Sequence, residues 1–507
     1  MIHQYQDIQK SVSISADVCV VGSGAGGATV AKELREAGYQ VVLIEEGGYF
    51  DTKDYRTDDT IWSTTHLYRD AGATAIVGKP SIMYAEGRCL GGSTTVNGGM
   101  CWRTPEKIMK RWQWEKRMTD FSPQKMDRYF SRAEGIINAS PIIPEAINRD
   151  SQLLKLGAEK AGYEVRANLR SAKTCVGANM CVMGCPTGAK QSTLQSYIPL
   201  YLNNGGEVYT NCRVQRVVTK RGRAIGVDGY FVDPITKKRM HKFKVRSKVV
   251  VVSCGAVQTP ALLMKSGIKS ESKLLGKNLI THPNAKVLAV FDEPVYAWKG
   301  VNQGFQITEF FEEGILMAVN FAPPSIAALA LPHELPNPMQ ILKDEFHHMV
   351  MGAALIEDTS RGQVRVGPMG TVLPFYNLNS WDFERAVRAV SLLTEVFFKA
   401  GARKCYLPFT GMPEIQSIDE IPKIFEKNLK PKDIELMTVH IMGTAQMGGD
   451  PKRSVINTHG EFHGVKGLFV ADASVFPTSI GVNPQLTIMA LATRTAEYIA
   501  NQFRQYL

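Results

Sequence analysis

Residues 16–45 follow a strand–helix–strand pattern that few protein folds can accommodate. An apolar run at residues 16–21 predicts a buried parallel strand, and residues 28–37 carry the apolar spacing of a helix. A second apolar run then ends at Glu45. Three glycines in the spacing G-x-G-x-x-G stand between the first strand and the helix. This is the pattern of a complete βαβ unit that binds a dinucleotide, and it predicts an α/β fold with a parallel sheet.

Each position in this motif has a physical role. Gly22 permits the tight turn, Gly24 lets the backbone approach a pyrophosphate, and Gly27 lets the helix pack close to the strand. The free amides at the start of the helix, next to Ala25, face the phosphate charge. The carboxylate of Glu45 stands where it can accept hydrogen bonds from an adenosine ribose. The alternative is a glycine-rich turn in an ordinary α/β sheet, which would not need all of these features together.

The length and charge of the chain exclude several classes of protein. The 507 residues are enough for two domains, and no apolar run is long enough for a membrane-spanning helix. The polar N-terminus, residues 1–16, lacks the apolar core of a signal peptide, so we expect a cytoplasmic location. The net charge of +11 predicts a solvated basic surface. Peripheral contact with an anionic membrane or an acidic redox partner is the alternative, and no nucleic-acid-binding motif is present.

Two further stretches are rich in glycine and small hydroxyl residues. This composition is typical of backbone that passes close to a flat ligand. The first is residues 86–99. The second is residues 440–487, in which a strand ending at Asp472 precedes a helix that begins near Pro484. Free amides at such a helix start suit another part of the same ligand. We therefore expect both stretches to contact the ligand of the first motif.

The rest of the chain predicts ordinary elements. Helices with basic faces are expected within residues 105–170, a β meander at residues 206–253, and a second domain of short strands with a helix at residues 381–400. Within that domain, residues 319–332 are apolar and broken by prolines. They are too short to span a membrane, and we expect a pocket wall or a domain contact there rather than plain core.

Three of the nine cysteines, Cys175, Cys181 and Cys185, lie within eleven residues, and Pro186 follows the last. The odd total without a signal peptide argues against a disulfide framework. Structural zinc normally takes four ligands, and this run lacks a fourth. Thiolate ligation of an iron–sulfur cluster fits better, because the C-x3-C-P ending is similar to bacterial ferredoxin runs. Inert or regulatory thiols and another metal are the alternatives.

Five ordered motifs resemble those of the glucose–methanol–choline (GMC) flavoenzyme family, and the resemblance covers the whole chain. They are the βαβ fingerprint ending at Glu45, residues 91–97, residues 255–268, residues 276–283, and the stretches around His440 and Asn483. The resemblance implies a Rossmann-type FAD-binding domain with a parallel sheet and an α+β substrate domain with an antiparallel sheet. The implied segments are residues 1–105, 190–285 and 432–507 for the FAD-binding domain, 106–189 for a helical, cysteine-bearing segment, and 286–431 for the substrate domain.

The resemblance also implies where FAD is held. Its expected contacts are Gly22, Gly24, Ala25, Gly27, Glu45, Gly92, Ser93, Asn97, Gly98, Val214, Asp472, Ala473, Pro484, Gln485 and Leu486. Members of the family that bind FAD covalently carry a histidine where this chain has Val96. We therefore expect noncovalent, dissociable FAD.

In this family an alcohol is oxidised by hydride transfer from its carbinol carbon to flavin N5. The motif match implies that His440 is the base that removes the hydroxyl proton, a task that suits an imidazole with a pKa near the working pH. Asn483 occupies the partner position and would hydrogen-bond the substrate oxygen. Of the other histidines, His282 is the one that could approach the cofactor region.

The cysteine spacing resembles a branch of GMC dehydrogenases that carries a 3Fe-4S cluster, whereas residues 184–193 resemble the long-chain alcohol oxidases. A cluster would pass electrons from FAD to a cytochrome or quinone. We expect a dehydrogenase that acts on a hydrophobic alcohol. A sugar or polyol dehydrogenase and an alcohol oxidase that makes hydrogen peroxide are the alternatives, and a GMC-fold lyase is a more distant one.

Overall fold

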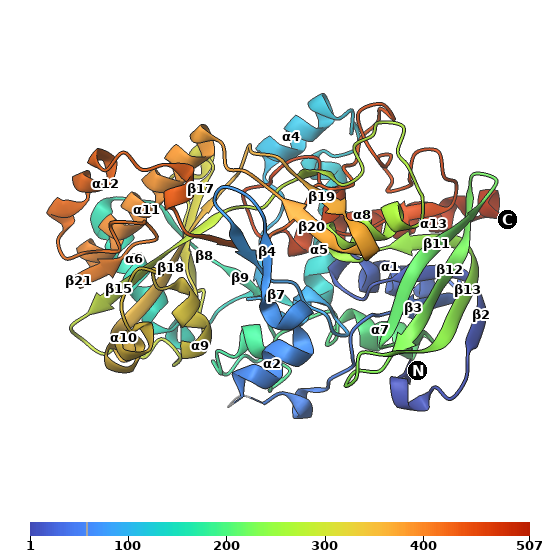
Figure 1. Cartoon of the computed structure of the whole chain (residues 1–507), viewed down its shortest axis with the longest axis horizontal. Coiled ribbons are helices and arrows are strands. Elements are labelled where there is room, and N and C mark those ends of the chain that lie inside the picture. The colour runs from blue at the N-terminus through green and yellow to red at the C-terminus, as the bar shows by residue number, and fades with distance from the viewer. Residues whose placement is uncertain (57–58) are drawn as a thin grey trace.

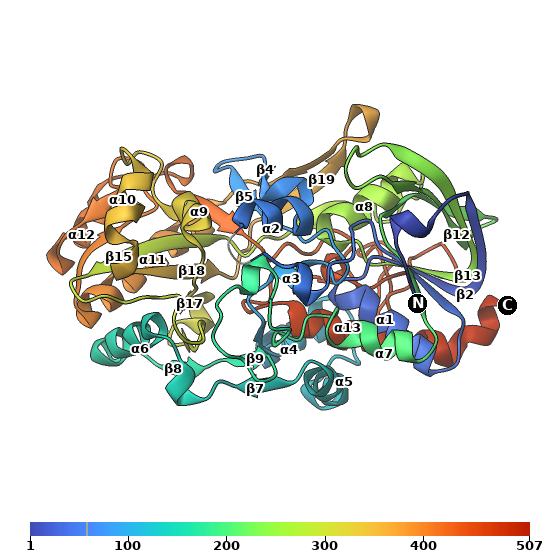
Figure 2. The same cartoon turned by 90° about the horizontal axis from the view of Figure 1, so that it is seen from below.

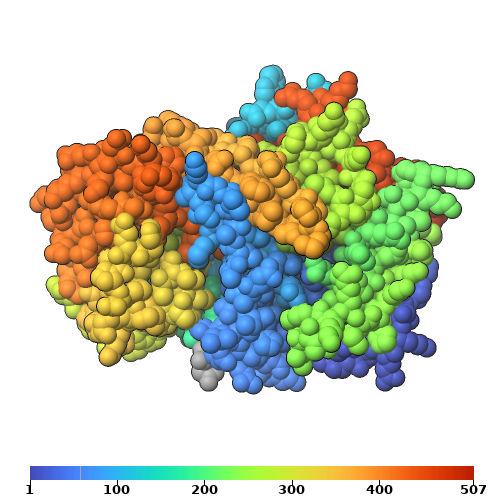
Figure 3. Space-filling view, viewed as in Figure 1, coloured from blue at the N-terminus to red at the C-terminus, as the bar shows by residue number. Residues whose placement is uncertain are grey.

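The computed structural model describes residues 1–56 and 59–507. The molecule is elongated, and two halves, each centred on a sheet, lie side by side along its longest axis (Figure 1). In the space-filling view the segment in lighter blue covers the junction of the two halves on this face (Figure 3). Both chain termini lie in the half that contains the first sheet.

The helices of the described residues are α1 (Ala25–Glu36), α2 (Thr60–Leu67), α3 (Ser93–Val96), α4 (Glu106–Glu115), α5 (Pro123–Ile136), α6 (Arg149–Ala161), α7 (Tyr197–Asn203), α8 (Gly255–Lys265), α9 (Pro324–Ala327), α10 (Pro338–Glu345), α11 (Ser380–Ala400), α12 (Pro422–Glu426) and α13 (Gln485–Gln502). The helices predicted within residues 105–170 and at 381–400 are thus confirmed as α4, α5, α6 and α11.

The strands of the described residues are β1 (Ile2–His3), β2 (Val12–Val21), β3 (Val41–Ile44), β4 (Thr74–Ile76), β5 (Ile82–Tyr84), β6 (Met100–Cys101), β7 (Ala139–Pro141), β8 (Val165–Ala167), β9 (Leu169–Ser171), β10 (Glu207–Tyr209), β11 (Cys212–Lys220), β12 (Arg223–Val232), β13 (Arg239–Val252), β14 (Lys277–Leu279), β15 (Asn284–Phe291), β16 (Phe305–Ile307), β17 (Ile315–Val319), β18 (Met349–Ile356), β19 (Gly362–Val366), β20 (Val372–Phe375), β21 (Ala402–Tyr406), β22 (Glu414–Ile415), β23 (Leu436–Thr438) and β24 (Leu468–Val470).

The first sheet has the strand order β1-β10-β3-β2-β13-β12-β11, and β24 pairs with β13 off this path. The pairs from β1 to β13, and the β13–β24 pair, are parallel. The predicted meander, β11 to β13, adds antiparallel strands at one side. Parallel pairing suits residues 18–21, 41–44 and 249–252, because these runs are apolar and buried on both faces.

The predicted βαβ unit is confirmed as β2–α1–β3, with β2 and β3 paired in parallel. Helix α1 begins at Ala25, three residues before the predicted start, because the glycines of the motif form its first turn. It packs against α7 and α13, so the N-terminal and C-terminal regions share one helical layer beside the sheet (Figure 1). The Rossmann-type fold expected from the sequence is therefore present.

The second sheet has the order β4-β5-β23-β15-β18-β17-β16-β8, with β21 and β22 attached through β15. Its pairs are antiparallel except for β23 with β5. Helices α6 and α11 pack together and cover one face. Helices α9 and α10 lie on the side away from α6 (Figure 2). This is the α+β domain with an antiparallel sheet that the resemblance implied.

This second sheet draws strands from segments that the sequence analysis placed elsewhere. Strands β4 and β5 lie within residues 1–105, β8 within residues 106–189, and β23 within residues 432–507. The chain therefore crosses between the two halves more often than the predicted segments allow. The crossings put residues just after β5 and β23 at the junction of the domains.

The two halves have separate apolar cores, one around the parallel sheet and one between the second sheet, α6 and α11. Among the described residues, no helix combines the length and the apolar character needed to cross a membrane.

Candidate active site

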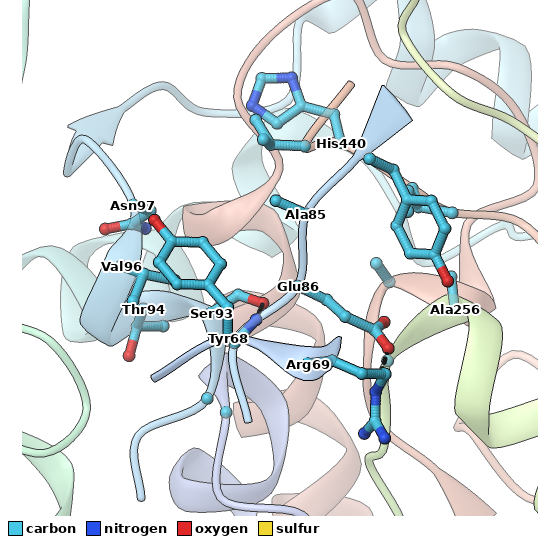
Figure 4. A pocket seen from close by; sticks show the side chains of 18 of the residues that line it. Tyr68, Arg69, Ala85, Glu86, Ser93, Thr94, Val96, Asn97, Ala256 and His440 are labelled. Atoms are coloured by element: carbon cyan, nitrogen blue, oxygen red, sulfur yellow. Dashed lines mark hydrogen bonds and ion pairs between the residues drawn. The ribbon is translucent and has the colours of Figure 1, made fainter. Parts of the chain in front are cut away.

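A cavity of about 900 Å³ lies between the two domains. Its lining includes the glycine loop before α1, the segment of residues 92–100, the start of α13, and the face of the second sheet that turns away from α6 and α11. Figure 4 shows His440 at one end of this cavity, with Glu86 and Arg69 paired at another part of the wall. All of the glycine-rich stretches singled out in the sequence meet here.

The glycines of the first motif are required by close backbone contacts. A Cβ on Gly22, where φ is +99°, would lie 2.2 Å from the carbonyl oxygen of Ser253. A Cβ on Gly27 would lie 1.9 Å from the carbonyl oxygen of Gly22. Gly24 differs, because a Cβ there would meet nothing within 4 Å and this residue lines the cavity. Gly24 therefore leaves room for a ligand rather than for protein.

This difference gives a test of cofactor placement. Gly24→Ala is expected to fold normally, because its φ of −67° suits alanine and no protein atom blocks the new methyl group. Its affinity for FAD is expected to fall about 10- to 100-fold, the scale of one or two lost charged hydrogen bonds to the pyrophosphate. The measurements are FAD titration and the melting temperature of the apoprotein.

The matched control for Gly24→Ala is Gly135→Ala, in helix α5, where a Cβ also meets nothing within 4 Å. This control is expected to keep FAD affinity and to stabilise the fold by about 0.5–1 kcal/mol. If Gly24→Ala binds FAD within about threefold of the unchanged protein, the pyrophosphate does not approach this residue.

Glu45 is buried at the end of β3 and is held by the glycine loop. One carboxylate oxygen accepts bonds from the backbone N–H (3.0 Å) and the hydroxyl (2.6 Å) of Ser23, and the other accepts from the N–H of Gly47 (2.8 Å). Burial raises the pKa of Glu45, and these bonds oppose the rise. Each carboxylate oxygen has further acceptor capacity, so the predicted role toward a ribose stays compatible with these contacts.

Residues 92–98 form the part of the wall next to the glycine loop. Gly92 precedes α3 with a φ of +52°, and a Cβ there would lie 2.9 Å from the Cα of Gly24. The amide of Asn97 bonds the side chain of Gln485, at the start of α13. The other amide atoms of this pair, Asn97 Oδ1 and Gln485 Nε2, are buried without a hydrogen-bond partner. Orphaned polar atoms beside an open cavity indicate a polar ligand.

The cavity brings together most of the residues that the sequence analysis selected. Its lining includes Gly22, Gly24, Ala25, Glu45, Gly92, Ser93, Val96, Asn97, Gly98, Val214, Asp472, Ala473, Pro484, Gln485, His440 and Asn483. Gly27 and Leu486 do not line it. Gly27 is packed against Gly22, and Leu486 points into the apolar core beside the parallel sheet. Direct contact of any of these residues with FAD stays a prediction.

His440 follows strand β23 and shares the cavity with Asn483. Its Nε2 lies 3.3 Å from the side-chain nitrogen of Asn483, whose Oδ1 is buried without a partner. Burial, together with the nearby charge of Lys286, lowers the pKa of His440 to about 4. The imidazole is therefore neutral at neutral pH, which is the state that a proton acceptor requires.

His282 lies directly behind His440, with the two Nδ1 atoms 3.4 Å apart. Its Nε2 accepts bonds from the backbone N–H groups of Ile480 (3.2 Å) and Gly481 (3.1 Å). These donors place the proton of the neutral His282 ring on Nδ1, pointing at His440. Only one of the two facing Nδ1 atoms can carry a proton in this bond, so the tautomers of the two rings are linked.

Several cavity residues were not selected from the sequence. A half-buried charge cluster is formed by Arg69, which contacts Glu46 at 3.0 Å and also pairs with Glu86. Burial raises the pKa of Glu46, but the charges of Arg69 and Arg213 outweigh it and lower the value to about 2. A single sequence gives no signal for this cluster, because its members meet only where β5 returns beside α2.

The sequence analysis also did not select Lys286 and a group of amide side chains on or next to the strands of the second sheet. Lys286 lies on β15 and lines the cavity, as do Asn284, Asn302, Gln303, Gln306 and Asn320. The alternation of β15, with polar residues at 284 and 286 on one face, is the signal that could have indicated a cavity-facing strand.

The three clustered cysteines do not form a metal site in the described structure. Among residues 1–56 and 59–507, no three His, Cys, Asp or Glu side chains are gathered in a way that could hold a metal ion. Cys175 is exposed, and Cys181 lines the cavity. Two buried cations lie close to these thiols. Arg170 contacts the sulfur of Cys181 at 3.6 Å, and Lys190 donates to its carbonyl oxygen at 2.6 Å.

Two models of the GMC oxidoreductase family match residues 64–284 and 358–492, and a model of the NAD(P)-binding Rossmann-like domain matches residues 20–76. The chain belongs to the GMC oxidoreductase family. An uncharacterised GMC-type oxidoreductase of Sinorhizobium fredii is 33% identical over 97% of this chain and 95% of its own. The long-chain-alcohol oxidase FAO4A of Arabidopsis thaliana is 27% identical over 95% of this chain and 68% of its own.

The fold of this GMC oxidoreductase is also found in solved structures. Pyridoxine 4-oxidase from Mesorbium loti superposes with a TM-score of 0.73 over 96% of this chain and 99% of that one, at 18% identity. A formate oxidase gives a TM-score of 0.72 over 98% of this chain and 100% of that one, at 16% identity. The chain is thus an oxidoreductase enzyme with the fold of GMC flavoenzymes.

The residues present fit FAD, the cofactor that the family supports. The open face of Gly24, the buried carboxylate of Glu45 and the orphaned amide atoms of Asn97 and Gln485 all border one cavity. A pyrophosphate, a ribose and a flavin ring have the donors and acceptors to satisfy these groups.

Proposed function

We propose that this GMC oxidoreductase uses noncovalently bound FAD to oxidise the CH–OH group of a small-molecule substrate. The observation that carries the proposal is that His440 and Asn483 lie 3.3 Å apart on the same cavity as the dinucleotide motif. FAD, when bound, supplies the acceptor for the hydride that leaves the carbinol carbon. Val96, which lines the cavity, offers no side-chain atom for a covalent link to FAD.

His440 takes up the hydroxyl proton at Nε2, the nitrogen that lies toward Asn483. This uptake requires the tautomer that carries the ring proton on Nδ1. In that tautomer the Nδ1–Nδ1 bond between the two rings is not made, because His282 keeps its own proton on Nδ1 while its Nε2 accepts from the backbone. His282 acts as a positioning residue, because its bonds to the backbone of Ile480 and Gly481 fix the ring that holds His440 in place.

Asn483 holds the substrate oxygen without gaining or losing a proton. Its amide N–H, which lies toward Nε2 of His440, can donate to the hydroxyl oxygen and to the carbonyl oxygen that develops from it, while the hydroxyl hydrogen is donated to His440. Together the two side chains direct one hydroxyl group of the substrate to a fixed point in the cavity.

The test is anaerobic mixing of the FAD-loaded protein with panels of aliphatic alcohols, sterols and sugars, followed at the absorbance of oxidised flavin. The proposal expects bleaching with at least one class and release of a yellow supernatant after acid precipitation. Flavin retained in the pellet would contradict the noncovalent link. Failure of every CH–OH donor to bleach the flavin, with FAD bound, would favour a GMC-fold lyase.

Which acceptor takes the electrons from the reduced flavin is the subject of a separate hypothesis. An iron–sulfur cluster on Cys175, Cys181 and Cys185 would favour a cytochrome or quinone, whereas an oxidase would use dioxygen. These thiols are not gathered around a metal position in the described structure, so we derive no step through a cluster. Measuring the iron and sulfide content of anaerobically purified protein tests for the cluster, since a cluster predicts about three iron and about four sulfide per FAD.

A further inference from the structure

The cavity-facing side of the second sheet carries a row of polar side chains. Asn284 and Lys286 lie on β15, Gln306 on β16, and Asn320 directly after β17. Small and apolar residues of β17 and β18, such as Ala318 and Ala353, lie between them on the same face, as the register shows. The sheet therefore presents polar groups on both sides of a shallow apolar strip.

Lys286 is 9% exposed, and none of the ion pairs among the described residues includes it. Its Nζ donates one bond, to Oδ1 of Asn320 at 2.9 Å, and it has two further N–H groups. Burial lowers the pKa of Lys286 to about 8, and no carboxylate opposes this shift. A buried amine without a counter-charge is costly, so its retention needs a partner that the protein does not supply.

Four amide oxygens on the same side of the cavity also have no partner. They are Oδ1 of Asn284, Oδ1 of Asn302, Oε1 of Gln303 and Oε1 of Gln306. Gln306 and Asn302 are only 1% and 3% exposed. Two of these oxygens are on the sheet and two are in the loop before β16. Buried acceptors are nearly always hydrogen-bonded in native proteins, so these four oxygens point to donors on a ligand. Hydroxyl groups are such donors.

The pairing register of β15 with β23 indicates how far Lys286 lies from His440 along the sheet. Asn284 is opposite Met437 in the antiparallel pair of β15 and β23, and β23 leads into His440. Lys286 is two residues further along β15, away from His440, and two strand residues span about 7 Å. A hydroxyl at His440 and a group at Lys286 therefore belong to parts of one substrate that are several bonds apart.

A long-chain alcohol does not provide hydrogen-bond partners for the polar groups on this side of the cavity. The facing segment is apolar, with Phe321, Ala322 and Ile326 on the cavity, and confirms the predicted pocket wall at residues 319–332. An aliphatic chain laid along the sheet would, however, offer no acceptor to Lys286 and no donor to the four buried oxygens, and excluding water from the ammonium group costs about 1–3 kcal/mol. The incompletely bonded ammonium group of Lys286 thus favours a substrate that carries an acceptor over the hydrophobic alcohol that the sequence analysis expected.

We propose that the substrate is an anionic polyol, a sugar-like molecule whose carboxylate or phosphate binds Lys286 while its hydroxyls donate to the amide oxygens. This inference rests on the proposed CH–OH oxidation, because it assumes that one hydroxyl of the same molecule reaches His440. The oxidation leaves the anionic group unchanged. The hydroxyl proton would go to His440, the carbinol hydrogen would leave with its electron pair as a hydride to FAD, and the product is a carbonyl compound.

The experiment uses the FAD-loaded enzyme and compares four kinds of probe. These are hexuronates and aldonates, hexose 6-phosphates, neutral hexoses and hexitols, and 1-decanol. Binding is measured by calorimetry, and flavin reduction is measured separately under anaerobic conditions. The anionic sugars are expected to bind about 10- to 100-fold more tightly than neutral ones, the scale of one charged hydrogen bond. The first two arms distinguish a carboxylate from a phosphate.

The variant Lys286→Met removes the charge and keeps the length of the side chain. It is expected to weaken binding of the anionic sugars about 10- to 100-fold and to leave neutral sugars within about twofold. Lys286→Arg keeps the charge and should retain part of the affinity. Lys343→Met is the matched control, because Lys343 is an exposed lysine on α10 of the same domain, and it should change nothing.

Equal binding of anionic and neutral sugars, or an unchanged affinity in Lys286→Met, would overturn the proposal. So would fast flavin reduction by 1-decanol without reduction by any sugar. If anionic sugars bind through Lys286 but no probe reduces the flavin, the binding inference stands and the proposed oxidation fails. If neutral sugars reduce the flavin and Lys286→Met has no effect, the oxidation stands and this inference fails.

Discussion

Replacing His440 with alanine is expected to slow reduction of the bound flavin by substrate about 100- to 10,000-fold, the usual scale for loss of a general base. The reason is that Nε2 of His440, 3.3 Å from the amide of Asn483, is the group placed to take the hydroxyl proton. The FAD content should stay near normal, because His440 lies apart from the glycine loop. Stopped-flow absorbance under anaerobic conditions gives the rate.

The control for this variant is His347→Ala, an exposed histidine of the substrate domain, which should leave the rate unchanged. The pH dependence offers a second check. Because the pKa of His440 is lowered to about 4, the rate should hold as pH falls from 7 and decline only when the imidazole becomes protonated near pH 4. A His440→Ala rate within about threefold of the unchanged enzyme would show that this residue is not the base.

Replacing Arg69 with methionine is expected to lower the free energy of unfolding by about 1–3 kcal/mol, the usual cost of leaving partly buried polar groups without their hydrogen-bond partner. Arg69 is 14% exposed in its side chain and pairs with both Glu46 and Glu86. Without it, the negative charges of two half-buried carboxylates lie near each other with less compensating positive charge. Denaturant unfolding of the apoprotein and the FAD-loaded protein measures the effect.

Arg216→Met provides the contrast, because Arg216 forms an ion pair with Asp228 (2.7 Å) while its side chain is 61% exposed. This control should cost less than about 1 kcal/mol, as exposed ion pairs do. Combining Arg69→Met with Glu46→Gln and Glu86→Gln should recover part of the lost stability, since no unpaired carboxylate then remains in the half-buried cluster. An Arg69→Met variant as stable as Arg216→Met would mean that water already solvates the cluster.

Local patterns determined the parts of this protein that depend on neighbours in the chain. The turn at Gly22, the close packing at Gly27 and the buried runs on either side are constraints on adjacent backbone, so the βαβ unit could be predicted from residues 16–45. The same holds for α4, α5 and α11, because the spacing of apolar residues that predicts a helix depends only on residues close together in the sequence. Motif matches likewise placed His440 and Asn483 in one site.

The cysteine run shows where local spacing falls short. Cys175, Cys181 and Cys185 are close in sequence, but metal binding requires sulfurs that converge on one point. That convergence depends on the path of the loop, and the described structure does not provide it. The nearby cations Arg170 and Lys190 come from positions that spacing alone could not connect with the thiols.

The sequence by itself determined the dinucleotide motif, the Rossmann-type half, the family resemblance and the two side chains proposed to act on a hydroxyl. Only the tertiary structure decided what surrounds them. Strand pairing across the second sheet sets Lys286 and the unpartnered amides against the cavity, and the return of the chain behind β23 sets His282 against His440. These contacts join residues more than 30 positions apart, and their chemistry depends on burial and on unmet hydrogen bonds, which exist only after the chain has folded.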